Sequence, residues 1–514
     1  MKEKIQKKSE SWCSKMNFRS LKINKIRKLN KNTDQSMQQP LLSFVGKFEE
    51  TQDFREWSIQ VNDQKIMIFF LESVVSKEKF NELVFVPLSN LKGEHIEEFL
   101  ISLNGKETKN QEEIISLLLK GSFAVCLPDS QKIYMASFPK ELERTIQEPV
   151  NEVVVRGSHD GFIENLQTNI FLIRNRIESP DLTVRYMDIG TKSKTKISLV
   201  YLKGIANEDI VKEIERRLSF VKTDMIISPG YIEEFIEDNS FSIFPQILNT
   251  ERPDRVMANL TEGRIILMAE GTPTALIMPA TFVTFYQSPD DYNSRWIPAT
   301  FIRVLRFLSF IIAITLPGIY IAINAFHLEV IPHELVIPLK NSVEGIPYPP
   351  LLEAFMMELT IELIREAGIR LPRPIGQTIG IVGGLVIGDA VVNAGLISNI
   401  MIVVVALTAV SSFVVPSNEM STTVRLLRFP LMILASIMGF VGLMFGIIYI
   451  LIALCRLESF GVPYFAPFAP FRLKEIKDTF IRIPLWMMNK RPQSSGAIDL
   501  FRQKDSRGWK KHEE

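Results

Sequence analysis

The stretch from Ile375 to Ile397, IGQTIGIVGGLVIGDAVVNAGLI, constrains the fold more than any other part of the chain. It is apolar and long enough to cross a bilayer, which takes about 20 residues at helical rise. Glycines recur in it at every fourth position, at Gly376, Gly380, Gly384 and Gly388. Each would weaken an isolated helix in water, whereas small residues spaced four apart let membrane helices pack closely. The pattern therefore predicts a membrane helix packed tightly against others.

A second stripe lies beside the glycines at about 100° per residue. Its members are Thr378, Ile381, Leu385, Asp389 and Val392. If the glycines pack helices around a ring, this stripe faces a central axis and forms a pore lining with an apolar constriction and one carboxylate. The alternative is a glycine-mediated contact inside one subunit, with Asp389 in an interface hydrogen bond. An ionisable group at this depth is costly unless it faces protein, water or an ion path, and both interpretations meet that condition.

Upstream lies an apolar helix, LLEAFMMELTIELIREAGIRLPRP, that carries Glu358, Glu362 and Glu366 at a spacing of four. These three residues share one face. The face is either the solvated side of an interfacial helix or an acidic vestibule that concentrates cations before the pore.

Charged residues crowd the first 300 and last 60 positions, while the chain from Phe307 to Leu454 is mostly apolar. We therefore expect a soluble α/β N-terminal region, made of two small α/β subdomains, followed by an α-helical multi-pass membrane domain. The expected divisions are a basic arm at 1–45, the α/β subdomains at 46–148 and 149–290, the membrane domain at 291–456 and a cytoplasmic tail at 457–514.

The second subdomain has the clearer pattern. Strands are expected at NEVVV from Asn151, at Leu182 to Met187, at Ile197 to Leu202 and at Met225 to Ile227, with amphipathic helices between them, one of them capped by Asn207. This β-α-β-β-α-β order predicts a ferredoxin-like sheet covered on one face. A hairpin across Glu270 to Thr272 adds two strands.

Four membrane spans are expected, at Phe307 to Phe326, Ile375 to Ile397, Ile400 to Val415 and Leu431 to Leu454. Basic residues before the first span and after the last place both termini in the cytoplasm. This topology puts Arg425 and Arg428 on the outer side, against the positive-inside rule.

Other function classes find little support. The 59 basic and 58 acidic residues balance, so no nucleic-acid partner is expected. Cys13, Cys126 and Cys455 lack a paired spacing. No phosphate-binding GxxxxGK[ST] loop, HExxH metal motif or nucleophile elbow occurs. We therefore expect no catalytic residues, no metal site and no cofactor, and the chain is not expected to be an enzyme.

Seven segments between about Val150 and Pro470 together resemble the GerA family, the A subunits of the germinant receptors of endospore-forming bacteria. They are VVRGSHDGFIENLQTNIFLIRNRI, FPQILNTERPD, QSPDDYNSRW, ELIREAGIRLPRPIGQTIGIVGGLVIGDAVV, VVALTAVSSFVVP, RLLRFPLM and SFGVPYFAP.

The resemblance implies a protein of the spore inner membrane whose N-terminal region faces the spore core. It implies a B subunit that resembles transporters and senses the nutrient, and a lipoprotein C subunit. It also implies that copies of this chain assemble into a pentameric ring that releases monovalent cations. The leading hypothesis is a nutrient-gated cation channel with its apolar gate at Leu385. A secondary transporter and a non-conducting scaffold that clusters the B and C subunits are the alternatives.

Overall fold

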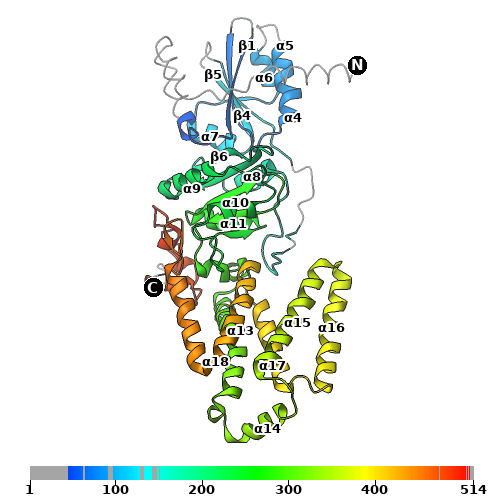
Figure 1. Cartoon of the computed structure of the whole chain (residues 1–514). Coiled ribbons are helices and arrows are strands. Elements are labelled where there is room, and N and C mark those ends of the chain that lie inside the picture. The colour runs from blue at the N-terminus through cyan, green and yellow to red at the C-terminus, as the bar shows by residue number, and fades with distance from the viewer. Residues whose placement is uncertain are drawn as a thin grey trace.

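The computed structural model of the chain describes residues 44–61, 64–90, 96–127, 132–141, 148–149, 151–473, 475–504, 506–507 and 509. It does not describe the side chains at 64, 65, 89, 90, 373, 374, 377–379, 381, 382, 385 and 387. The expected basic arm, residues 1–45, lies almost wholly outside these ranges. Figure 1 shows two α/β units, one beyond the other, and a helical region that extends away from the second unit.

The first α/β unit is built on a five-stranded antiparallel sheet of order β1-β2-β4-β5-β3. Its elements are β1 (Phe54–Val61), β2 (Gln64–Leu71), α4 (Lys77–Phe80), the π-helical turn η2 (Asn81–Phe85), α5 (Val86–Asn90), α6 (Ile96–Ser102), β3 (Lys106–Glu107), α7 (Gln111–Leu119), β4 (Ser122–Leu127) and β5 (Lys132–Ser137). Successive side chains of a strand point to opposite faces. Ile68 and Phe70 of β2 accordingly pack with α4 and α6, while Phe69 and Leu71 pack with α7.

The second α/β unit also has a five-stranded antiparallel sheet, in the order β6-β7-β9-β10-β8. Its elements are α8 (Leu166–Arg174), β6 (Leu182–Ile189), β7 (Thr195–Leu202), α9 (Glu208–Phe220), α10 (Pro229–Ile236), β8 (Leu248–Thr250), α11 (Pro253–Thr261), β9 (Ile265–Ala269), β10 (Ala275–Met278), the 3-10 turn η4 (Phe282–Tyr286) and α12 (Pro289–Asn293). Buried residues of α8 and α11 pack on one face of the sheet, and those of α9 and α10 pack on the other.

The two expected α/β units are therefore present, but the ferredoxin-like topology predicted for the second is wrong. Neither NEVVV from Asn151 nor Met225 to Ile227 forms a strand, and helices cover both faces of the sheet. The hairpin across Glu270 to Thr272 is confirmed as β9 and β10. The predicted cap is also confirmed, because the Asn207 side chain accepts a hydrogen bond from the Asp209 amide at the start of α9.

A buried ion pair joins the two units. Arg174 of α8 donates from Nε and Nη2 to the two carboxylate oxygens of Asp53, at 2.7 and 2.8 Å, and both side chains are fully buried. Ser73 and Thr51 also donate to Asp53, each at 2.6 Å. Backbone contacts continue the junction, since the Gln52 amide donates to the Val184 carbonyl at 2.8 Å.

The chain after the helical region returns to the second unit. It forms the short hairpin β11 (Glu458–Ser459) and β12 (Val462–Pro463). Phe460 and Val462 are buried in the same cluster as residues of α9 and α10. The Tyr464 carbonyl accepts a hydrogen bond from the Phe282 amide at 2.8 Å. The core of the second unit is thus completed by residues almost 200 positions later in the chain.

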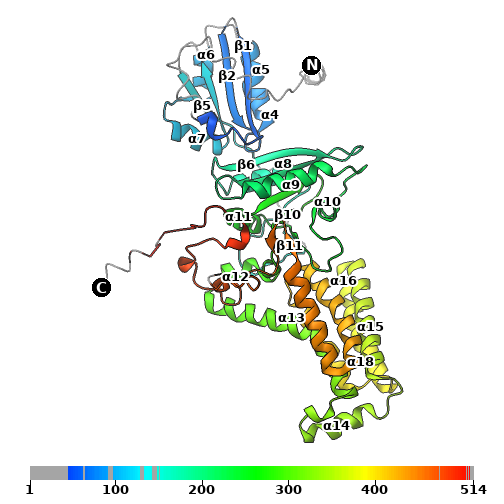
Figure 2. The same ribbon diagram turned by 60° about the vertical axis from the view of Figure 1, so that its left-hand side comes forward.

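The helical region consists of α13 (Trp296–Ala325), the 3-10 turn η5 (Leu328–Val330), α14 (His333–Val343), α15 (Pro350–Arg370), α16 (Arg373–Asn393), α17 (Asn399–Phe413) and α18 (Asn418–Arg456). The 3-10 turns η6 (Ile476–Asp478), η7 (Leu485–Met487) and η8 (Gln493–Ser495) follow in the C-terminal segment. In the part of the chain that the structure describes, α13 and α18 are long and apolar enough to cross a membrane, and α17 is a shorter apolar helix. In Figure 2, α14 lies at the end farthest from the α/β units, and α15 and α16 run side by side.

Helix α18 is a hairpin of two antiparallel halves rather than one rod. Gly439 has φ 60° and ψ −138°, which reverses the chain direction. Thr423 in the first half donates to the Ile243 carbonyl at 2.7 Å, and Ser459 just after the second half donates to the Gln246 carbonyl at 2.8 Å. Both ends of α18 therefore reach the same loop of the second unit.

This hairpin corrects two expectations. The single span expected at Leu431 to Leu454 is wrong, because Gly439 lies in its middle and the chain folds back there. The placement of Arg425 and Arg428 on the side opposite the α/β units is also wrong, since the first half of α18 begins beside Ile243. The expected conflict with the positive-inside rule arose only because the four-span topology put Arg425 and Arg428 on the outer side. It no longer applies once these arginines lie at the end near the α/β units.

Candidate functional site

The predicted glycine helix is present as α16, which begins after Pro372 and runs from Arg373 to Asn393. Gly376 packs closely on α15, because a Cβ atom there would lie 2.7 Å from the Gly368 carbonyl oxygen. Three members of the ladder behave differently. A Cβ atom at Gly380, Gly384 or Gly388 would meet no atom within 4 Å. One end of the ladder is therefore used inside the chain, and the rest faces open space.

The structure reaches only part of the stripe expected to line a pore. The side chains of Thr378, Ile381 and Leu385 lie outside the described residues, although the backbone at these positions is helical. Asp389 is exposed and has no hydrogen-bond or ion-pair partner among the residues that the structure describes, and Val392 is half-buried. The pore-lining role of these residues remains a prediction.

The acidic face of α15 meets arginines of α18. Glu358 and Arg428 are both fully buried, with Oε2 and Nη1 2.6 Å apart. Glu362 lies 2.8 Å from the Arg428 guanidinium and 2.6 Å from that of Arg425. Glu366, one turn further on, pairs with Arg370 at an exposed position.

This geometry departs from the predicted acidic vestibule. Glu358 and Glu362 share a face, as their spacing required, but that face is turned toward the first half of α18. Their charges are balanced by Arg425 and Arg428 at close range, so they do not form an open acidic surface in this chain. Buried charges are tolerated only when paired in this way, and the cluster therefore fixes the α15–α16 pair to α18.

A second charged cluster lies where α13 leaves the second α/β unit. Asp291 of α12 accepts from Arg303 Nε at 2.9 Å and from Arg306 Nη1 at 2.8 Å, and all three side chains are almost fully buried. Arg303 also pairs with Asp478 at 2.7 Å, as does the Tyr292 hydroxyl at 2.8 Å. Burial and the neighbouring Asp478 carboxylate raise the pKa of Tyr292, so this hydroxyl stays a donor.

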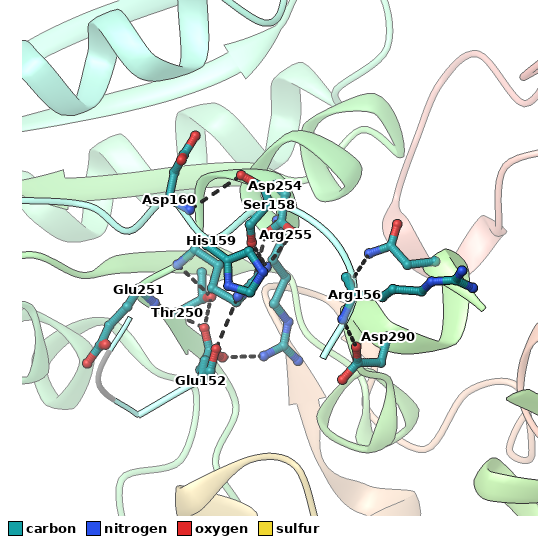
Figure 3. Close-up of polar contacts among 12 residues, drawn as sticks. Glu152, Arg156, Ser158, His159, Asp160, Thr250, Glu251, Asp254, Arg255 and Asp290 are labelled. Atoms are coloured by element: carbon teal, nitrogen blue, oxygen red, sulfur yellow. Dashed lines mark hydrogen bonds and ion pairs between the residues drawn. The ribbon is translucent and has the colours of Figure 1, made fainter. Parts of the chain in front are cut away.

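Three sequence motifs that lie far apart in the chain meet in the second α/β unit, as Figure 3 shows. They are RGSHD at 156–160, NTERPD at 249–254 and SPDDYN at 288–293. Glu152 binds the Thr250 hydroxyl and pairs with Arg255 at 2.6 Å. Arg252 donates to the Ser158 carbonyl at 2.7 Å. These contacts hold the irregular segment 151–160 against β8 and α11.

The same segment is also held by α12. The Asp290 carboxylate accepts from the backbone amides of Val155 and Arg156, at 3.2 and 3.3 Å, and Asn293 donates to the Arg156 carbonyl at 3.0 Å. These side-chain contacts take the place of a strand ladder, which is why NEVVV is not a strand. Val153 and Val155 stay exposed.

Sequence reasoning named none of these junction residues as functional. The available signal was three short motifs rich in Arg, Asp and Glu, but their meeting depends on the tertiary fold. The carboxylates of Glu152, Asp254 and Asp290 bind arginines, a hydroxyl and backbone amides, an arrangement that positions chain segments. Among the described residues, no group of three or more His, Cys, Asp or Glu side chains could hold a metal ion.

Comparison with known proteins agrees with the motifs. The profile of the Bacillus/Clostridium GerA spore germination protein family matches residues 43–494. Spore germination protein KA of Bacillus subtilis (strain 168) is 42% identical over 451 residues, which cover 86% of this chain and 83% of that protein. Spore germination protein B1 of the same organism is 40% identical over 449 residues, covering 86% and 93%.

Two further proteins are similar to this chain. Spore germination protein GerLA of Bacillus cereus is 40% identical over 389 residues, which cover 76% of this chain and 79% of that protein. The crystal structure of the N-terminal domain of the A subunit of the Bacillus megaterium spore germinant receptor GerK3 aligns with 29% identity and a TM-score of 0.37, covering 47% of this chain and 94% of that domain. The family match and the relatives near 40% identity establish that this chain belongs to the GerA family of spore germination proteins.

Proposed function

We propose that this chain is the A-type membrane subunit of a spore germinant receptor and that copies of it assemble into a ring around a nutrient-gated channel for monovalent cations. The observation that carries this proposal is the open face of α16. A Cβ atom at Gly380, Gly384 or Gly388 would have no neighbour within 4 Å, and Asp389 is exposed. Glycine stripes of this kind pack against other helices in membranes, and no helix in the described part of this chain covers these three positions.

The arrangement of the helices supports a multi-pass topology. Helices α13, α15, α16, α17 and the two halves of α18 alternate in direction, which gives six passes in place of the four expected from hydropathy. An even number returns the chain to the side of the α/β units, in agreement with Thr423 and Ser459 both contacting the loop 243–246. We place the protein in the spore inner membrane with both termini on the core side.

In this proposal α16 from each copy lines the axis. The glycine stripe packs on the neighbouring copy, and the stripe of Thr378, Ile381, Leu385, Asp389 and Val392 faces the path of the ions. A ring of Leu385 side chains closes the path by excluding water. The ring is expected to be a pentamer, and the B subunit, which resembles transporters and senses the nutrient, and the lipoprotein C subunit complete the receptor in contact with membrane lipid.

A non-conducting scaffold is the second candidate. The exposed Val153 and Val155 favour it, because they offer an apolar contact on the second α/β unit that this chain leaves uncovered. The secondary-transporter hypothesis has less support, because among the described helices the α15–α16 pair has no counterpart that resembles an inverted repeat.

The test measures potassium retention in dormant spores that carry the receptor with Leu385→Ala, without nutrient. We expect spontaneous potassium loss, because a smaller side chain at the constriction admits water. Val386→Ala is the matched control, since Val386 lies one position away and is 55% exposed in the single chain. Normal retention in the Leu385 variant, with germination intact on nutrient addition, would remove the gate from this residue and favour the scaffold.

A further inference from the structure

In the first half of α13 the charged residues are buried and the apolar residues are exposed, the opposite of a helix on the surface of a water-soluble protein. Arg303 and Arg306, its charged residues, are buried against Asp291. Its exposed residues are all apolar: Trp296, Ile297, Pro298, Phe301, Ile302, Val304, Leu305, Leu308 and Ile311. A surface helix in water shows the opposite pattern.

The exposed apolar face is also wide. At about 100° per residue, the positions from Ile311 round to Ile302 cover about half the circumference of the helix. A contact with one neighbouring element needs a stripe of only about 100°. This face is broad and carries no charged side chain. Such a face suits contact with lipid acyl chains better than contact with a single protein partner.

The direction of α13 changes along its length. Up to Phe310 it lies along the second α/β unit and the C-terminal segment: Phe307 stacks on Tyr286 of the unit with ring centroids 5.1 Å apart, and Thr300 donates to the Arg482 carbonyl of the segment at 3.2 Å. Beyond Ala313 it packs on α18 instead, so that a Cβ atom at Gly318 would lie 2.9 Å from Leu443. Pro317 lies inside the helix and cannot donate a backbone hydrogen bond. Figure 2 shows the first part running across beneath the α/β units and the rest turning away from them.

Aromatic and basic residues surround the start of this helix. Trp296 and Trp486 are about two-fifths exposed, at 43% and 42%, and Arg295 is exposed beside them. Tryptophan and arginine are the residues that favour the headgroup region of a bilayer, where an apolar ring and a polar group are both satisfied. Their position at the beginning of the apolar face marks the level of that region.

We propose that residues 296–311 form an interfacial helix that lies flat on the membrane, with its apolar face in the boundary between headgroups and acyl chains, and that the chain enters the bilayer only from about Ala313. The helical residues from Ala313 to Ala325 then cover about 20 Å at 1.5 Å per residue, so the turn Leu328–Val330 is needed to complete this pass. The helix lies between the bilayer and the second α/β unit, which Arg303 and Arg306 clamp to its upper side. This inference rests on the membrane location put forward above and goes beyond it, because it removes half of α13 from the membrane-spanning part.

The test measures the depth of nitroxide labels in the full chain, reconstituted into phosphatidylcholine and phosphatidylglycerol vesicles. Labels are attached to single cysteines, Ile297→Cys, Phe301→Cys and Leu308→Cys, after replacement of the three native cysteines. Depth is read from collision rates with oxygen, which dissolves in lipid, and with a water-soluble nickel complex. Labels at Met444 and Leu451 of α18, both exposed, are the control for a spanning helix.

We expect the three α13 labels to sit at one shallow depth. A helix along the membrane normal would instead spread positions 297 and 308 over about 16 Å at 1.5 Å per residue, and such a spread would overturn the proposal. Low collision rates with both reagents would also overturn it, because a second copy of the chain would then cover the face. If the α18 control labels are water-exposed as well, the membrane location itself fails; if they show a depth gradient while the α13 labels are water-exposed, only the interfacial helix fails.

Discussion

Removal of one carboxylate should loosen the whole junction between the two α/β units. Asp53 and Arg174 are fully buried and make two charged contacts, at 2.7 and 2.8 Å. In Asp53→Ala the Arg174 guanidinium loses its carboxylate partner. Among the described residues it then keeps the Leu182 carbonyl and the Thr51 hydroxyl as hydrogen-bond acceptors. An uncompensated buried charge costs about 3–5 kcal/mol. We expect the free energy of local opening of this junction to fall by that amount.

The assay is hydrogen exchange of the full chain in detergent micelles, followed on peptides from α8 and β1. A loss of about 3–5 kcal/mol raises the exchange rate by roughly a hundred- to a few-thousandfold, at about 1.4 kcal/mol for each factor of ten. Peptides from α17 are the internal control and should not change. The paired replacement Asp53→Val with Arg174→Met should cost much less than Asp53→Ala, because it leaves no charge behind.

The Asp53–Arg174 pair should also make the stability of the junction depend on pH. Burial opposes the ionisation of Asp53, but the charge and hydrogen bonds of Arg174 outweigh it and hold the pKa of Asp53 below its usual value of 3.8. The pair therefore contributes fully above that usual value, and its contribution is lost as the pH falls through the lowered pKa. A rise of less than tenfold in exchange for Asp53→Ala, or a paired variant as damaged as the sum of its single changes, would refute the reasoning.

Two further predictions concern the α18 hairpin and the carboxylate of Glu233 on α10. Gly439→Ala should lower the melting temperature of the detergent-solubilised chain strongly, because φ is positive and the new Cβ atom would lie 2.8 Å from His327 Nε2; Gly271→Ala, also at positive φ but with open space, is the control and should cost about 1 kcal/mol. Burial and the nearby Glu419 and Glu237 carboxylates raise the pKa of Glu233 from its usual 4.5 to about 9, so wild-type stability should fall as the pH rises from about 4.5 to about 9. Glu233→Gln should flatten that fall in melting curves taken between pH 6 and 10, and an unchanged pH profile would contradict the assignment.

Local patterns in the sequence predicted local structure well. The glycine helix was expected from Ile375 and begins at Arg373, and the Asn207 cap and the β9–β10 hairpin formed as expected. Each of these features is determined by residues within a few positions of one another. Apolar periodicity, a capping side chain and a glycine turn act through contacts that the nearby sequence specifies.

Contacts between distant segments could not be predicted in the same way. Glu358 looked like part of a solvated face, because its partner Arg428 lies 70 positions away and on a helix of opposite direction. The reversal at Gly439 was hidden because the chain is apolar on both sides of it, and hydropathy shows no break where a membrane-type helix turns back. The junction of RGSHD, NTERPD and SPDDYN was equally hidden, since it depends on the order of the strands between them.

The return of Phe460, Val462 and Tyr464 to the second α/β unit has a consequence for biosynthesis. During translation, the residues of α9, α10 and η4 leave the ribosome long before these three side chains are made. The apolar surface that they later cover is exposed until every helix from α13 to α18 has been synthesised. A chain cut short within the helices would keep that surface open. Completion of the second α/β unit therefore requires synthesis of every helix from α13 to α18.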